Sequence, residues 1–319
     1  MLFRRIWLII FSKTKAKKIA QASLFIFLVI PIILLIKNSR RIIILRNDFT
    51  AENLATDILD SVDKDSILIV STDTPLFNTQ YVYYSRKLWP DVKLIHFSKL
   101  YLPFYIKQLN LDYPDIEISS IIDTSDKFGR FLKENSKNFT IFTKQSFSLS
   151  SGRWLPWGLV YKYLAEDKKE DVAETVARNE QLWKSYHDPL QGSLSTYQNL
   201  YLTDVLRVYG IARLEIGNFL AEEEYYDLAL PHLLLAKKLN PQDFDSYLLL
   251  AQIYMRQNKC SQAENEINQL LAKDSEDLTA LYVKYQNYLN CYHDLSRASK
   301  VLEVVEKARK KTETPLEKL

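Results

Sequence analysis

Glycine, cysteine and histidine are all scarce in this chain of 319 residues, which contains six, two and four of them. Glycine makes up about 2% of the chain against roughly 7% on average, and neither GxGxxG nor GxxxxGKS/T occurs. Gly-rich loops that hold nucleotide phosphates are therefore not expected. The histidines are dispersed and HExxH does not occur, so the sequence predicts no metal site and no cofactor.

Acidic residues are missing from the first 46 positions, which carry ten basic residues. These are Arg4, Arg5, Lys13, Lys15, Lys17, Lys18, Lys37, Arg40, Arg41 and Arg46. The rest of the chain holds 32 basic and 39 acidic residues, so its net charge is negative. Because the basic excess belongs to one segment, it does not indicate a nucleic-acid-binding domain, and no nucleic-acid partner is expected.

A long apolar run lies within this basic segment. From Ile19 to Ile36 only Gln21 and Ser23 are polar, and a helix of 18 residues is about 27 Å long, close to the thickness of a bilayer core. A cleaved signal peptide or a buried helix would also be apolar, but the run is followed by KNSRR, which offers no small-residue cleavage site. We therefore predict a single-pass membrane anchor within residues 1–46.

The basic residues around the run also indicate its orientation. Six of them precede the run and four follow it closely. Basic residues are enriched on the cytoplasmic side of a membrane helix. We therefore expect a cytoplasmic N-terminus and an extracytoplasmic soluble part.

Residues 47–165 alternate between helical and strand patterns. The run from Ser66 to Val70 (SILIV) is continuously apolar, as in a strand buried on both faces of a sheet. Further strand signals lie at 92–97, 116–122, 139–143 and 159–163, with helical patterns at 50–62, 75–88 and 127–135. The alternation predicts an α/β domain with a small, mostly parallel sheet.

Ligands of open α/β sheets bind at the carboxyl ends of the strands. Thr72 and Asp73 follow the first strand directly and are the first candidates for ligand-facing residues. Both residue types also cap helices, and Pro75 is placed to begin one, so a capping role stays open. His96 lies inside the second strand pattern, where a packed core residue and a catalytic base are both possible.

The C-terminal part repeats at a period of 34 residues. The matching pairs are Ile216/Leu250, Gly217/Ala251, Leu220/Tyr254, Ala229/Ala263, Leu233/Ile267 and Ala236/Leu270, with a weaker third copy from Tyr247/Leu281. This period and its small residues predict a tetratricopeptide-repeat helical array at 196–311, after a helical linker at 166–195 and before a charged tail at 312–319. In the third copy Arg297 occupies the position of an alanine and Ala298 is one step late, which an insertion or a capping role would explain.

Such arrays bind peptides or partner proteins in a groove. Five tyrosines of the repeats could line one: Tyr247, Tyr254, Tyr282, Tyr285 and Tyr288. They could instead fill the space between helices with their hydroxyls at the rim. Cys260 and Cys291 lie in inter-helix turns of adjacent repeats, where a disulfide is possible outside the cytoplasm, although spacing alone does not establish it.

The stretch from Phe49 to Leu109 resembles a known family. Its helix and strand, then Asp73, and then Pro90-Asp91-Val92 opening a second strand, are similar to the region after the last membrane helix of protein O-mannosyltransferase-like multi-pass glycosyltransferases. The later LPWGLVY and the repeats fit the same family. The resemblance adds Asp91 to the ligand-facing candidates, although Trp89 replaces the usual basic residue before that turn.

The resemblance implies an extracytoplasmic soluble moiety rather than an active site, because the acidic catalytic residues of the family lie in its polytopic half. We therefore expect a membrane-anchored, non-catalytic protein whose array holds a protein partner or acceptor. The alternative is one part of a split or truncated membrane glycosyltransferase, which pairs with a polytopic subunit and transfers a hexose from a lipid-linked donor to protein. A third hypothesis is an unrelated assembly scaffold.

Overall fold

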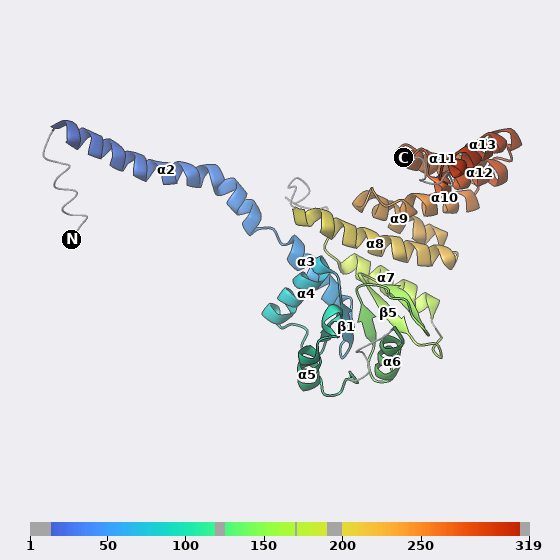
Figure 1. Cartoon of the computed structure of the whole chain (residues 1–319), viewed down its shortest axis with the longest axis horizontal. Helices are drawn as coiled ribbons and strands as arrows, with labels where there is room; N and C mark the ends of the chain where they lie inside the picture. Colours follow the sequence, from blue (N-terminus) through green and yellow to red (C-terminus); the bar gives the residue numbers. More distant parts are fainter. Residues whose placement is uncertain (1–13, 119–124, 170, 190–199, 313–319) are drawn as a thin grey trace. The chain divides into compact units, whose positions relative to one another are not determined.

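The fold is described from a computed structural model, which describes residues 14–118, 125–169, 171–189 and 200–312. The chain divides after Phe49 into two compact units (Figure 1). The first unit is dominated by α2 (Thr14–Arg46), and Pro31 lies inside this helix. Its stretch Gln21–Ile44 is long and apolar enough to cross a membrane, with a mean hydropathy of 2.1 and none of its apolar window buried. The predicted apolar helix is therefore confirmed, and it extends ten residues beyond Ile36.

The second unit begins with a five-stranded sheet of order β2-β1-β3-β5-β4. Its elements are α3 (Thr50–Asp60), β1 (Ile67–Val70), α4 (Asp73–Arg86), β2 (Lys93–His96), η1 (Phe97–Lys99), α5 (Pro103–Asp112), α6 (Ser125–Asn135), β3 (Ile141–Thr143), β4 (Arg153–Trp157), β5 (Val160–Leu164) and α7 (Val172–Ser185). The four residues of β1 are all buried. Leu68 and Val70 share a core with α3 and α4, whereas Ile67 and Ile69 share one with α5 and α6. Helices therefore cover both faces, as the continuous apolar run predicts.

The sheet is mixed, so the prediction of a mostly parallel sheet is wrong for its second half. Strand β1 pairs in parallel with β2 and β3, whereas β5 pairs antiparallel with β3 and β4. The unpredicted strand β4 forms a hairpin with β5 through the two-residue loop Gly158-Leu159. Gly158 has φ +59°, and a Cβ there would lie 1.8 Å from the Tyr186 hydroxyl, so this turn requires glycine.

Two further boundaries differ from the prediction. Residues 116–118 form no strand, and the rest of the predicted strand at 116–122 lies outside the described residues. Helix α7, expected in a linker, packs against β4, and its Leu182 and Trp183 belong to the core beneath α3 and α4. The segment at 172–185 is therefore part of the α/β fold rather than a spacer.

The remainder forms an array in which consecutive helices pack on one another (Figure 1). Its elements are α8 (Leu200–Glu222), α9 (Tyr226–Leu239), α10 (Asp245–Arg256), α11 (Cys260–Leu271), α12 (Leu278–Gln286), the π-helical turn η3 (Asn287–Cys291) and α13 (Leu295–Thr312). The first helix, α8, also contacts α3, α4 and β4. The array and the α/β domain therefore share one continuous core.

The geometry of the array is consistent with the 34-residue period. Paired residues such as Ala229 and Ala263 are both fully buried. Left-handed residues recur in the turns at Glu224 (φ +64°), Asn258 (φ +57°) and His293 (φ +56°), at spacings of 34 and 35. The extra residue in the third copy coincides with η3, because a π-turn accommodates a one-residue insertion. Accordingly Ala298, not Arg297, is the buried residue of the third copy.

Candidate functional site

Two of the predicted ligand-facing residues, Thr72 and Asp73, line a crevice of about 560 Å³, here called the β1/β3 crevice. Its walls are Thr72, Asp73, Thr74 and Pro75 after β1, Lys144, Gln145 and Ser146 after β3, Tyr161 of β5, and Asp204, Arg207, Val208, Ile211 and Glu215 of α8. From β1 the chain passes to β2 on one side and later returns to β3 on the other. The crevice therefore opens at a topological switch point, where ligands of such sheets bind.

The β1/β3 crevice contains three ionisable groups that influence one another: Lys144 after β3, Tyr161 of β5 and Glu215 of α8. The side chain of Lys144 is nine-tenths buried, and this burial lowers its pKa to about 8, against the opposing influence of the Glu215 charge. Burial raises the pKa of Glu215, although Tyr161 and Lys144 act in the other direction. The pKa of Tyr161 is raised by burial and by the same carboxyl group. The crevice can therefore bind an ionic or hydrogen-bonding ligand group beside a partly desolvated ammonium.

Replacing Lys144 by methionine is expected to stabilise the protein at pH 7. The pKa of Lys144 falls from 10.5 to about 8 on folding, so the unfolded state binds more protons between these values and stability rises with pH in that window. The shift corresponds to an upper bound of about 3 kcal/mol for the gain. Urea denaturation of both proteins at pH 7 and pH 10 should show the gap closing at the higher pH. The exposed Lys169→Met variant is the control, and a less stable Lys144→Met protein at pH 7 would contradict the burial cost.

The structure does not bring the third ligand-facing candidate to this crevice. Asp91 is exposed and precedes β2, so it lies at the amino end of the parallel strands, whereas Asp73 lies beyond the carboxyl end of β1. Thr72 is the N-cap residue of α4 but makes no capping hydrogen bond through its side chain, and the helix begins before Pro75.

His96 is buried in β2, its backbone N–H donates to the Tyr105 hydroxyl at 2.8 Å, and burial lowers its pKa. This environment is that of a packed core histidine.

The five tyrosines proposed to line a groove divide between core and surface. Tyr247 and Tyr288 are buried, with the Tyr247 hydroxyl donating to the Pro241 carbonyl and the Tyr288 hydroxyl donating to Glu264. Tyr254 is partly buried against the core. Tyr282 is 51% exposed, and its ring centroid lies 6.0 Å from that of Tyr285. Tyr247 and Tyr288 therefore fill the space between helices and do not line a groove.

A different set of side chains lines a cavity of about 570 Å³ between α10 and α12, here called the α10/α12 groove. These are Gln252, Met255, Arg256, Gln286, Asn290 and Cys291. Two of the positions recur at the repeat period, since Gln252 and Gln286, and likewise Arg256 and Asn290, are 34 residues apart. The 34-residue period of the sequence therefore extends to these polar positions, where it signals the lining of the groove.

A disulfide fixes one end of the α10/α12 groove. Cys260, at the start of α11, is bonded to Cys291 of η3, with their Cα atoms 5.6 Å apart. The Asn287 side chain also donates to the Cys260 carbonyl at 3.1 Å. The possible disulfide is thus present, and it holds the π-turn that carries Asn290 and Cys291 against the preceding repeat.

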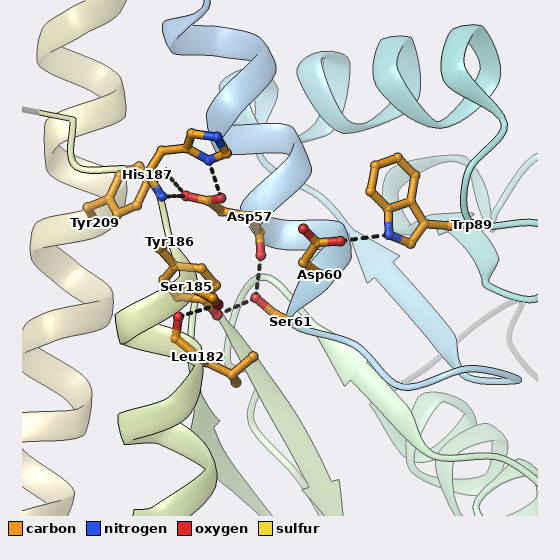
Figure 2. Close-up of polar contacts among 9 residues, drawn as sticks. All are labelled: Asp57, Asp60, Ser61, Trp89, Leu182, Ser185, Tyr186, His187 and Tyr209. Carbon is orange, nitrogen blue, oxygen red and sulfur yellow. Dashed lines mark hydrogen bonds and ion pairs between the residues drawn. The ribbon is translucent and has the colours of Figure 1, made fainter. Parts of the chain in front are cut away.

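Sequence reasoning missed a buried carboxylate at Asp57 in α3 (Figure 2). It accepts hydrogen bonds from the Tyr209 hydroxyl of α8 at 2.5 Å and from the backbone N–H of His187 at 2.9 Å. The His187 Nδ1 lies 2.7 Å from the other carboxylate oxygen. Beside it, the Tyr186 and Ser61 hydroxyls are 2.6 Å apart. These contacts join α3, the segment after α7, and α8, so the cluster fixes the array to the α/β domain.

Within the described parts of the chain, no group of three or more His, Cys, Asp or Glu side chains is placed to hold a metal ion. No family model, no curated protein and no solved structure matches the chain.

Proposed function

We propose that this chain is a membrane-anchored, extracytoplasmic binding protein whose tetratricopeptide-like array holds a polypeptide segment in the α10/α12 groove. The observation that carries the proposal is the groove lining, in which Gln252, Gln286 and Asn290 supply amide groups from neighbouring helices. An amide side chain both donates and accepts, as does each peptide unit of an extended chain. Gln252 and Gln286 are 34 residues apart, so equivalent positions of neighbouring repeats each offer an amide to the peptide units of such a chain.

The compartment in this proposal is supported by the disulfide between Cys260 and Cys291. Disulfides persist in oxidising compartments and are rare in the cytoplasm. The excess of basic residues before the apolar run supports the same orientation. Single-pass anchoring is supported by the 24-residue apolar stretch of α2. The resemblance to a family that modifies proteins favours a polypeptide as the bound partner.

A peptide screen tests the groove. The full chain in detergent is screened against a random peptide library, and the affinity of enriched peptides is measured by fluorescence anisotropy. The double variant Gln252→Ala/Gln286→Ala removes two hydrogen-bonding groups from the groove. At about 1 kcal/mol for each bond, it should weaken binding by roughly tenfold or more.

Two other glutamines provide a matched control. Gln262 and Gln269 lie on α11 and do not line the groove, so Gln262→Ala/Gln269→Ala should bind the same peptides as the unaltered chain. Equal affinity of the groove variant and the unaltered chain would refute binding in this groove. So would the absence of any enriched peptide.

A further inference from the structure

The most exposed apolar side chains of the second unit are concentrated in one region. Among the residues after Phe49 whose exposure the structure describes, eight large apolar or aromatic side chains are at least 60% exposed. Seven of them lie between positions 77 and 111: Phe77, Tyr81, Tyr84, Leu88, Tyr101, Phe104 and Leu111, here called the aromatic face. A single exposed apolar residue is ordinary, but such a concentration marks an interaction surface.

The residues of the aromatic face follow the helix period. Phe77, Tyr81 and Tyr84 form one stripe on α4, and Leu88 continues it just beyond the helix end. The buried residues of α4, including Leu76 and Val82, belong to the core on the other side. The stripe is therefore a second apolar side of a helix whose core-facing side is already packed.

The two halves of the aromatic face meet around an edge of the sheet. Strand β2 is the edge strand, with α4 preceding it and α5 following it on the opposite face. The Tyr83 hydroxyl of α4 donates to the Val92 carbonyl at 2.7 Å and lies 3.4 Å from the Tyr113 hydroxyl that follows α5. These contacts link α4 to the residue before β2 and to the residue that follows α5, so the two helices approach one another at this edge strand.

The aromatic face belongs to the unit that directly follows the membrane helix in the chain. Only residues 47–49 separate α2 from α3, a segment that spans at most about 11 Å. Arg86 in the last turn of α4 pairs with Glu52 in the first turn of α3. The Leu88 end of the aromatic face therefore lies beside the start of α3, a few residues from α2.

The charges in this region suit an anionic lipid surface. From Phe77 to Leu111 the chain carries five basic residues (Arg86, Lys87, Lys93, Lys99 and Lys107) and one acidic residue, Asp91, and the exposed Asp112 follows directly. Lys93 is buried and lies 3.9 Å from both Asp65 and Asp115, and Arg86 pairs with Glu52, so three lysines carry the surface charge. Lys87, Lys99 and Lys107 are exposed. The rest of the chain beyond residue 46 is net acidic, so this basic excess is local.

We propose that the aromatic face lies in the headgroup region of the membrane that anchors the chain. Phe and Leu side chains bury apolar surface at the acyl boundary, Tyr rings lie with their hydroxyls toward water, and the lysines contact anionic headgroups. The proposal rests on the membrane anchoring of the proposed function, but it is independent of peptide binding in the α10/α12 groove. It assigns α4 and α5 a second contact with the bilayer besides α2.

Photocrosslinking of the full chain tests this contact. Tyr81 and Phe104 are each replaced by p-benzoylphenylalanine, an aromatic change at a surface position. The proteins are reconstituted in vesicles of phosphatidylcholine and phosphatidylglycerol, irradiated, and examined by mass spectrometry for lipid adducts. The same replacement at Ile33 in α2 is the positive control, and at the exposed Tyr282 of α12 it is the matched negative control.

Lipid adducts are expected at Ile33, Tyr81 and Phe104 and not at Tyr282. If Ile33 is labelled while Tyr81 and Phe104 are not, or crosslink only to protein, the face does not contact lipid and the anchor stands. If Ile33 itself captures no lipid, the anchor is wrong and this inference is wrong with it. Pure phosphatidylcholine vesicles should give fewer adducts at Tyr81 and Phe104 and leave the Ile33 adduct unchanged, and equal yields there would overturn the role of anionic headgroups.

Discussion

Replacing Asp57 by alanine is expected to lower the free energy of unfolding by about 2–4 kcal/mol, because it leaves two hydrogen-bond donors without their acceptor at about 1–3 kcal/mol each. The Asp57 side chain is only 1% exposed. Its loss leaves the buried Tyr209 hydroxyl and the His187 backbone N–H without their acceptor (Figure 2). Unsatisfied buried donors carry a full desolvation penalty. Because the cluster joins α3 to α8, we expect α8 and the sheet to lose their fixed packing together.

Urea denaturation followed by tryptophan fluorescence measures this change. Asp60 provides the control in the same helix, because it is exposed and accepts a single hydrogen bond from the Trp89 indole at 3.0 Å (Figure 2). Asp60→Ala should cost less than about 1 kcal/mol. If Asp57→Ala unfolds at the same urea concentration as Asp60→Ala, the cluster does not hold the two parts together.

Removing the disulfide is the second large change. The bond between Cys260 and Cys291 closes a loop with a sequence separation of 31 residues, for which the loss of unfolded-state entropy predicts about 3–4 kcal/mol of stabilisation. Cys260→Ser/Cys291→Ser should lower the denaturation midpoint accordingly. It should also weaken peptide binding, because Cys291 lines the α10/α12 groove.

The state of the cysteines in native membranes checks the same bond. Alkylation before and after reduction, followed by mass spectrometry, should find both thiols protected until a reductant is added. Thiols that are fully alkylated without reduction would contradict both the disulfide and the oxidising compartment. A double-serine variant as stable as the unaltered chain would contradict the expected loop constraint.

Much of the helical array could be predicted from the sequence because its contacts are local. Ala229 and Ala263 are buried at equivalent places because each helix pair packs on its sequence neighbour. Strand β1 was equally evident, since four consecutive apolar residues are typical of a strand covered on both faces. The sequence also shows that Ala298 is one position late in the third copy. The π-helical turn η3 accommodates this extra residue.

The other features depend on contacts between distant residues. Strand β4 contains Pro156 and follows Gly152, so its local pattern is that of a loop until it pairs with β5. Asp57 is an ordinary helix residue in sequence, and its partners lie 130 and 152 residues away. The strand-end rule predicts Thr72 and Asp73, but Lys144 and Glu215 reach the same crevice from the segment after β3 and from α8.

Protease treatment of sealed membrane vesicles of known orientation tests most directly whether the array works outside the cytoplasm. Protease added on the extracytoplasmic side should cleave within residues 50–312 and leave a protected fragment that contains α2. Cleavage of the array only from the cytoplasmic side would contradict the proposed orientation. Recovery of the intact, uncleaved chain in the soluble fraction would contradict the anchoring itself.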